Sequence, residues 1–131
     1  MAGRVLVVED NAVNRKLIEA LLKKFGVEAR CVENGQEAVA ALDTDDRPDM
    51  VLMDIQMPVM DGITATEELR RRDREAGRPH LPVIALTAGA FEDDRRRCME
   101  AGLDDFLTKP VIVDELVAML EKWLPPRQSV A

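Results

Sequence analysis

The sequence predicts a doubly wound α/β fold in which helices cover both faces of a five-stranded parallel sheet. Two observations support this prediction. Short apolar runs alternate with longer segments whose apolar residues recur at helical spacing, as in successive βα units. The short runs are also continuously apolar, as expected for parallel strands that are buried on both faces. The connections between such strands are right-handed crossovers.

The first part of the chain is predicted to form two βα units: a strand over 4–8, a helix over 13–25 that ends at Gly26, a strand over 27–32 and a helix from about 35 to 42. The helix over 13–25 is predicted from one apolar stripe that includes Val13 and Leu17, so we expect both side chains to face the core. Asn34 can cap the second helix, with Glu37 as its capping-box partner.

The rest of the chain is predicted to form three more units: a strand over 50–54, a helix from 61–62 onward, a strand over 83–86, a helix over 91–101, a strand over 104–108 and a helix over 116–124. The charged stretch 70–78 is expected to be the solvated end of the third helix and the loop after it. The helix over 91–101 has a thin apolar stripe, which predicts that it packs loosely.

A single domain is expected over residues 1–126, with 127–131 as a frayed tail. A chain of 131 residues buries enough surface to fold without disulfides or a structural metal, so any metal would serve function. The formal charge of -7 argues against direct binding to nucleic acid or to an anionic membrane, because both require a basic excess.

The cysteines and the hydropathy favour a cytoplasmic protein. Cys31 and Cys98 lack the Cys-x-x-Cys spacing of zinc and redox sites, so we expect free thiols in a reducing compartment. No apolar stretch approaches the roughly 20 residues that cross a bilayer, and the amino terminus lacks the apolar core of a signal peptide.

Three carboxylates follow buried strands. Glu9 and Asp10 end the apolar run 5–8, and Asp54 ends the run 50–53. If the strand order is 2-1-3-4-5, the first and third strands are neighbours whose crossovers leave in opposite directions, and the three acids project into the crevice between them. Carboxylates about 5 Å apart repel by about 3 kcal/mol per pair at an effective dielectric of 20, which a divalent cation can offset. Calcium also binds hard oxygen ligands, but a site with so few protein ligands suits Mg²⁺, which keeps several of its waters.

The same edge of the sheet carries the parts that phosphoryl transfer requires. Asp54 is the expected nucleophile, as an exposed carboxylate at a strand end. Thr87 and Lys109 end the next two strands, where they can supply a hydroxyl and a cation for the charge of a phosphoryl group.

Four motifs in order resemble the receiver domain of bacterial two-component response regulators: Val-Val-Glu-Asp-Asn at 7–11, Met-Asp-Ile-Gln-Met-Pro-Val-Met-Asp-Gly at 53–62, Ala-Leu-Thr-Ala at 85–88 and Phe-Leu-Thr-Lys-Pro at 106–110. The resemblance covers residues 4 to 124. It implies a flavodoxin-like (βα)5 fold with the strand order 2-1-3-4-5, and a cis peptide between Lys109 and Pro110.

The resemblance also implies a role for each residue of the site. The implied roles are Asp54 as phosphoacceptor, Glu9 and Asp10 as Mg²⁺ ligands together with Asp54 and the Gln56 carbonyl, Thr87 as the hydroxyl that engages the phosphoryl group, Lys109 as its cation, and Phe106 as the switch aromatic.

The segments 10–15 and 55–58 resemble most the receivers of hybrid sensor kinases and phosphorelays. This implies a partner that carries phosphohistidine, either a histidine kinase or a histidine phosphotransfer protein. Such a partner must approach Asp54 across the start of the first helix, so Asn14 and Arg15 are the expected contact residues, with side chains exposed.

Two other functions share part of this residue set. A phosphatase of the haloacid-dehalogenase type also uses a strand-end Asp and Mg²⁺, but it requires a second acid at the position of Gln56. An inactive receiver-like interaction module would keep the acids without phosphorylation. Asp61 is predicted to be a helix cap rather than a metal ligand, and His80 an exposed loop residue without a catalytic role.

Overall fold

The computed structural model describes residues 3–55, 60–88 and 92–124, except for the side chains of 92–94. It confirms a single parallel sheet of five strands in the order β2-β1-β3-β4-β5. The strands are β1 (Gly3–Val8), β2 (Val27–Val32), β3 (Met50–Asp54), β4 (Val83–Thr87) and β5 (Asp105–Thr108). The helices are α1 (Ala12–Lys24), α2 (Gly35–Leu42), α3 (Gly62–Ala76), α4 (Glu92–Ala101) and α5 (Val113–Trp123).

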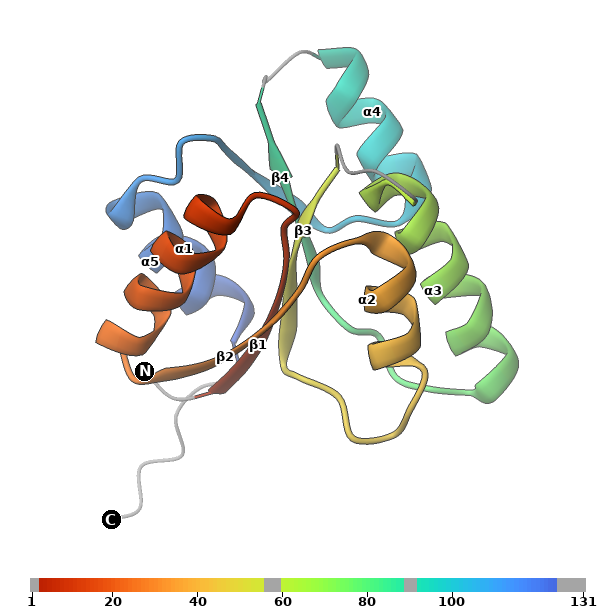
Figure 1. Cartoon of the computed structure of the whole chain (residues 1–131). Helices are drawn as coiled ribbons and strands as arrows, with labels where there is room; N and C mark the ends of the chain where they lie inside the picture. The colour runs from red at the N-terminus through yellow and green to blue at the C-terminus, as the bar shows by residue number, and fades with distance from the viewer. Residues whose placement is uncertain (1–2, 56–59, 89–91, 125–131) are drawn as a thin grey trace.

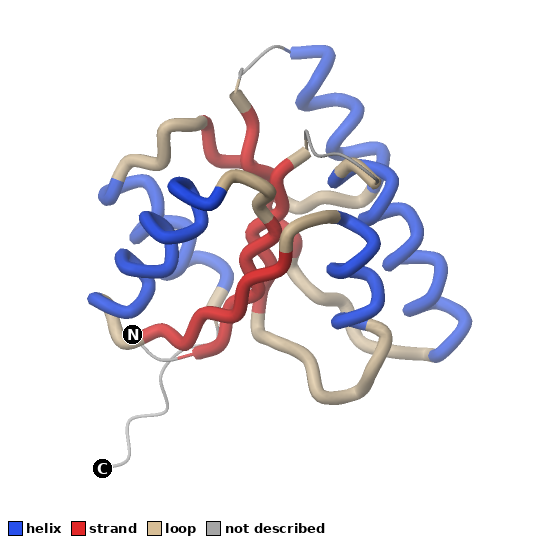
Figure 2. The backbone as a smooth tube through the Cα atoms, viewed as in Figure 1, coloured by secondary structure: helices blue, strands red, loops and turns tan. Residues whose placement is uncertain are grey.

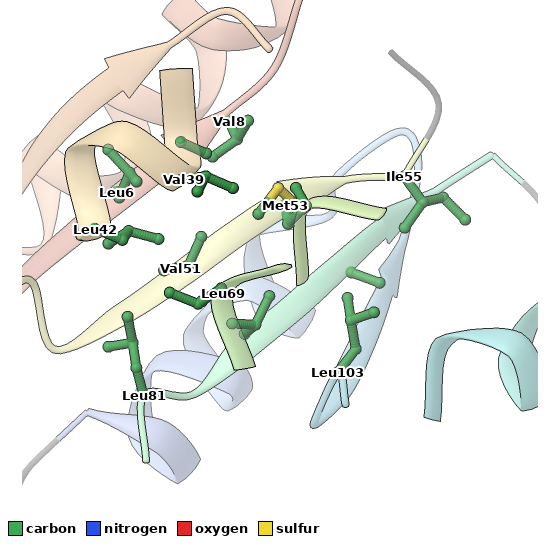
Figure 3. Packing of buried hydrophobic residues seen from close by; sticks show 14 of the residues in the cluster. Leu6, Val8, Val39, Leu42, Val51, Met53, Ile55, Leu69, Leu81 and Leu103 are labelled. Carbon is green, nitrogen blue, oxygen red and sulfur yellow. The ribbon is translucent and has the colours of Figure 1, made fainter. Parts of the chain in front are cut away.

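The sheet separates two helical layers. Helices α1 and α5 cover one face, and α2, α3 and α4 cover the other (Figure 1; the strands are red in Figure 2). Each face has its own apolar core. Ile18, Leu22, Leu116 and Leu120 fill the α1–α5 side. On the other side, Val39 and Leu42 of α2 pack over Leu6 and Val51 of the sheet (Figure 3).

The register of the sheet aligns the carboxyl ends of its strands. Val8 pairs with Met53, so Glu9 and Asp54 each follow one member of this pair. Asp54 in turn pairs with Leu86, the residue before Thr87. The polar residues expected at the strand ends therefore lie along one edge of the sheet.

Helix α1 packs against the sheet through a different face from the one expected. Val13 is 74% exposed and Leu17 is 46% exposed, whereas Asn14 and Arg15 are half-buried. The helix docks on the sheet through the row Asn14, Ile18 and Leu22, since residues four apart lie on one side of a helix. Val13 and Leu17 precede two members of this row by one residue, which turns them by about 100° away from the core.

The charged stretch 70–78 was expected to be a solvated helix end and loop, but part of it is buried. Helix α3 continues to Ala76 and ends at Gly77, whose φ of 68° suits glycine. Within the helix, Asp73 accepts two 2.7 Å hydrogen bonds from Arg47, and each side chain is only 8% exposed. Arg70 donates to the carbonyl oxygens of Leu81 and Gly102. One side of α3 therefore holds the loops that precede β3, β4 and β5 in place.

Both cysteines are free, as expected: Cys98 is buried and Cys31 is half-buried. Burial, with the neighbouring Glu19 carboxylate, raises the pKa of Cys31 to about 11. The exposed His80 ring lies 2.7 Å from Asp104, in agreement with the prediction of an exposed loop residue. Among the residues described, no helix has the length and apolar character needed to cross a membrane.

The buried pair of Arg47 and Asp73 should be important for stability. Asp73→Ala leaves the Arg47 guanidinium buried without its carboxylate, and should lower the free energy of unfolding by about 3–5 kcal/mol. Glu75→Ala is the matched control on the same helix, because Glu75 pairs with Arg71 at the surface; it should cost less than about 1 kcal/mol. Urea unfolding measures both values, and equal losses would contradict the prediction.

Candidate functional site

The three acids predicted to form a metal site come together at the carboxyl ends of β1 and β3. Glu9, Asp10 and Asp54 each offer a carboxylate oxygen, and these oxygens lie within 4.8 Å of one another. Asp10 is exposed. Glu9 is fully buried and Asp54 is only 2% exposed, so the expectation of an exposed Asp54 carboxylate was wrong.

Lys109 explains this burial. Its ammonium lies 2.8 Å from a Glu9 oxygen and 2.9 Å from an Asp54 oxygen, and so compensates both carboxylates at once. The Lys109 backbone N–H donates to the Thr87 carbonyl at 2.8 Å, which fixes the start of the β5–α5 loop against β4. The peptide between Lys109 and Pro110 is cis, as the family resemblance implied.

The electrostatics of the site follow from burial and charge. Burial raises the pKa of Glu9, and the nearby Asp54 charge acts in the same direction, while Lys109 and the Asn11 N–H oppose it. Burial disfavours the Lys109 ammonium, but hydrogen bonds to Glu9 and Asp54 outweigh this and leave its pKa raised. Lys109 is therefore charged at neutral pH. Because the cluster offers three carboxylates and one compensating cation, it is suited to bind a hard divalent cation.

The β1–α1 loop is fixed by contacts that the sequence analysis missed. Asn11 caps α1 by accepting hydrogen bonds from the N–H groups of Val13 and Asn14, both at 3.0 Å. An Asn just before an apolar helix is a signal that could have been used. Arg15 donates to the carbonyl oxygens of Glu9 and Asp10, both at 3.0 Å. No residue pattern indicates this contact, since its acceptors are backbone atoms.

Thr87 and Phe106 lie on the neighbouring strands β4 and β5, and β4 pairs with β3, the strand that carries Asp54. Thr87 ends β4 and is buried. Phe106 on β5 is half-buried and pairs in register with Ala85, two residues before Thr87. The Arg95 guanidinium of α4 lies 4.4 Å from the centre of the Phe106 ring, a cation–π contact.

Two further residues of the motif at 53–62 were assigned roles from the sequence, Asp61 as a helix cap and Gln56 as a metal ligand. Asp61 caps α3 by accepting a hydrogen bond from the Thr64 N–H at 2.7 Å, as predicted. Gln56, whose carbonyl was the fourth predicted metal ligand, lies outside the described residues.

Comparisons with known proteins agree with this geometry. A family model for the response regulator receiver domain matches residues 5–121. The sensor protein GacS of Pseudomonas syringae pv. syringae is 43% identical over 122 residues, which are 93% of this chain and 13% of GacS. The chain thus spans about an eighth of that relative's length.

Two solved structures are informative. The receiver domain of the sensor histidine kinase PA1611 from Pseudomonas aeruginosa is 40% identical, with a TM-score of 0.82 over 94% of this chain and 98% of that one. It contains a magnesium ion coordinated in its active-site cleft.

The receiver domain of the response regulator Ssk1 from Saccharomyces cerevisiae was crystallised with the histidine phosphotransfer protein Ypd1. It is 31% identical, with a TM-score of 0.87 over 92% of this chain and 87% of that one. The family match, the fold and the acidic cluster lead to the same conclusion: the chain belongs to the response regulator receiver domains, which act in phosphorelay signalling with a magnesium-binding acidic site.

Proposed function

We propose that this receiver domain accepts a phosphoryl group on Asp54 from a phosphohistidine on a partner protein, with Mg²⁺ held by Glu9, Asp10 and Asp54. The observation that carries the proposal is the position of the Asp54 carboxylate. It ends β3 beside the two other acids and 2.9 Å from the Lys109 ammonium. Nucleophile, metal ligands and cation are thus adjacent, as phosphoryl transfer requires.

In the proposed reaction an Asp54 oxygen forms a bond to phosphorus while the phosphorus–nitrogen bond of the phosphohistidine breaks. The electron pair of that bond returns to the imidazole, and Asp54 becomes an acyl phosphate. Bound Mg²⁺ supplies charge neutralisation for the phosphoryl oxygens. Lys109, freed from part of its contact with Asp54, can pair with one of the new oxygens, and the Thr87 hydroxyl can donate to another.

The proposed output is a change of packing beside β5. Drawing Thr87 toward the phosphoryl group would open space that the half-buried Phe106 ring can fill. Phe106 packs on the core beneath α2, α3 and α4, and Arg95 of α4 covers its ring, so a movement of Phe106 would alter the α4 surface.

The proposed partner is a histidine kinase or a histidine phosphotransfer protein. Its docking surface would comprise exposed apolar side chains in the first half of α1, in the β5–α5 loop and at the start of α5, which are Val13, Leu17, Ile112 and Val113. A small hollow of about 30 Å³ joins these segments beside Lys109, lined by Asn14, Leu17 and Pro110 among others. The Ssk1 receiver, crystallised with Ypd1, offers a precedent for this class of partner.

The docking roles of Asn14 and Arg15 remain proposals. Asn14 lines the hollow and can contact a partner there. Arg15 is half-buried and engaged with backbone carbonyls, so it is the weaker candidate for direct contact. A cytoplasmic location is likewise proposed, and the two free cysteines are consistent with a reducing compartment.

Because the chain belongs to the receiver family, the phosphatase of the haloacid-dehalogenase type is set aside as its function. The identity of residue 56 also argues against it, because Gln56 stands where such a phosphatase requires a second acid. The alternative of an inactive module differs from the proposal in one respect, namely whether Asp54 is phosphorylated.

Asp54→Asn should abolish phosphorylation. Incubating the wild-type chain with acetyl phosphate and Mg²⁺ should add the mass of one phosphoryl group, which peptide mapping should assign to Asp54. The control is Asp61→Asn, which retains a capping side chain and should be phosphorylated like wild type. An unmodified wild-type chain would favour the inactive module, and a phosphate on another residue of the Asp54 variant would refute the assignment.

Asp10→Asn should weaken Mg²⁺ binding and stabilise the metal-free protein. The variant loses one carboxylate ligand, which should cost about tenfold or more in affinity by calorimetry. It also removes one of three mutually repelling charges, so the metal-free melting temperature should rise. Glu121→Gln makes the same charge change on the exposed side of α5 and should alter neither value. Unchanged affinity together with a lower melting temperature would contradict the prediction.

Leu17→Glu should slow transfer from a protein donor but not from acetyl phosphate. The protein donor is a phosphorylated histidine phosphotransfer protein that transfers to the wild-type chain, with Ypd1 as the first choice. Placing a charge on the apolar surface should slow this transfer by about tenfold. The control is Met99→Glu, since Met99 is an exposed apolar residue on α4. Equal slowing with both donors would place Leu17 in the reaction rather than in docking.

A further inference from the structure

Arg15 contacts the backbone that carries the acidic pair. Its side chain is only 19% exposed, and its Nη1 donates to both the Glu9 and the Asp10 carbonyl oxygens at 3.0 Å. Its Nη2 lies 3.4 Å from the Glu33 carboxylate in the β2–α2 loop. A single guanidinium thus joins two consecutive peptide units of the β1–α1 loop to a neighbouring loop.

The peptide unit between Asp10 and Asn11 is held at both ends. Its carbonyl oxygen accepts from Arg15, and its N–H donates to the Glu9 carboxylate at 3.2 Å. The preceding peptide unit is held by the Arg15 bond to the Glu9 carbonyl. Fixing both peptide planes fixes the direction in which the Asp10 side chain leaves the backbone.

We infer that Arg15 is a positioning residue for Mg²⁺: it orients the β1–α1 loop so that the Glu9 and Asp10 carboxylates converge with that of Asp54. This inference rests on the acidic cluster being the magnesium site. Residues that hold metal ligands in place through a further hydrogen bond commonly affect metal affinity about tenfold or more when removed.

Because Arg15 is a cation, its charge and its hydrogen bonds should have opposite effects on Mg²⁺ affinity. A cation beside two metal ligands should repel Mg²⁺, so if Arg15 acted through its charge alone, its removal would tighten binding. Glu33 partly compensates this charge. If Arg15 acts by holding the two carbonyls, its removal weakens binding in spite of the charge that is lost.

Isothermal titration of Mg²⁺ into wild type, Arg15→Ala, Arg15→Gln and Arg15→Lys tests the inference in the intact chain. Arg15→Ala should bind about tenfold more weakly. Arg15→Lys retains a donor that can reach the carbonyls and should recover most of the affinity, with Arg15→Gln between the two. The metal-free Asn11 amide should exchange with deuterium faster in Arg15→Ala, because its peptide unit is held at one end only.

The matched control is Glu33→Gln, which removes the charge partner but leaves both carbonyl contacts, and should bind Mg²⁺ like wild type. Unchanged or tighter binding in Arg15→Ala would overturn the inference. It would also be overturned if Arg15→Lys lost as much Mg²⁺ affinity as Arg15→Ala while the Asn11 amide of both variants stayed as protected from exchange as in wild type. If Arg15→Ala does not fold, the Lys and Gln variants decide. Failure of the wild-type chain to bind Mg²⁺ would instead refute the metal site itself.

Discussion

The contact of one ammonium with two buried carboxylates is the interaction on which the site depends. Glu9 and Asp54 are almost fully removed from water, and Lys109 lies within 2.9 Å of both. Without that cation, two like charges would be buried together, an arrangement that is costly in any protein interior. Mg²⁺ binding and phosphorylation of Asp54, as proposed, would both change the charge around Lys109, so each would alter the same electrostatic balance.

The loops around this charge cluster are linked to one another. The Gly35 N–H, at the start of α2, donates to the Met60 carbonyl before α3 at 3.1 Å. The approach is so close that a Cβ at position 35 would lie 2.4 Å from that oxygen. With Arg15 reaching Glu33, the loops after β1, β2 and β3 form a continuous set of contacts. The acids are therefore placed by neighbouring loops as well as by their own strands.

The fold and the composition of the site could be predicted from sequence because their signals are local. A continuously apolar strand followed by an acid is visible at 50–54, and parallel topology brings such strand ends together. The orientation of α1 could not be predicted in this way. Its apolar residues include both the buried Ile18 and the exposed Leu17, so two faces about 100° apart fit the pattern equally well.

Other features depend on distant partners that no local pattern reveals. The run 70–78 has the composition of a solvated surface, yet Asp73 is buried because Arg47, far away in sequence, reaches it. The Lys109 contact that accompanies the burial of Asp54 likewise joins distant residues, since Asp54 ends β3 and Lys109 begins the β5–α5 loop. Arg15 binds backbone oxygens, which every residue possesses, so its partners carry no residue signature.

The division of the core into two layers has a consequence for how a signal could pass through the domain. The proposed donor surface belongs to the α1–α5 layer, whereas Phe106 packs in the layer of α2, α3 and α4. The sheet lies between these two layers (Figure 1), and Asp54 is the last residue of β3, at the carboxyl end of the strand. The proposed input and output surfaces therefore lie on opposite sides of the sheet, which would leave room for an upstream and a downstream protein to bind the domain at the same time.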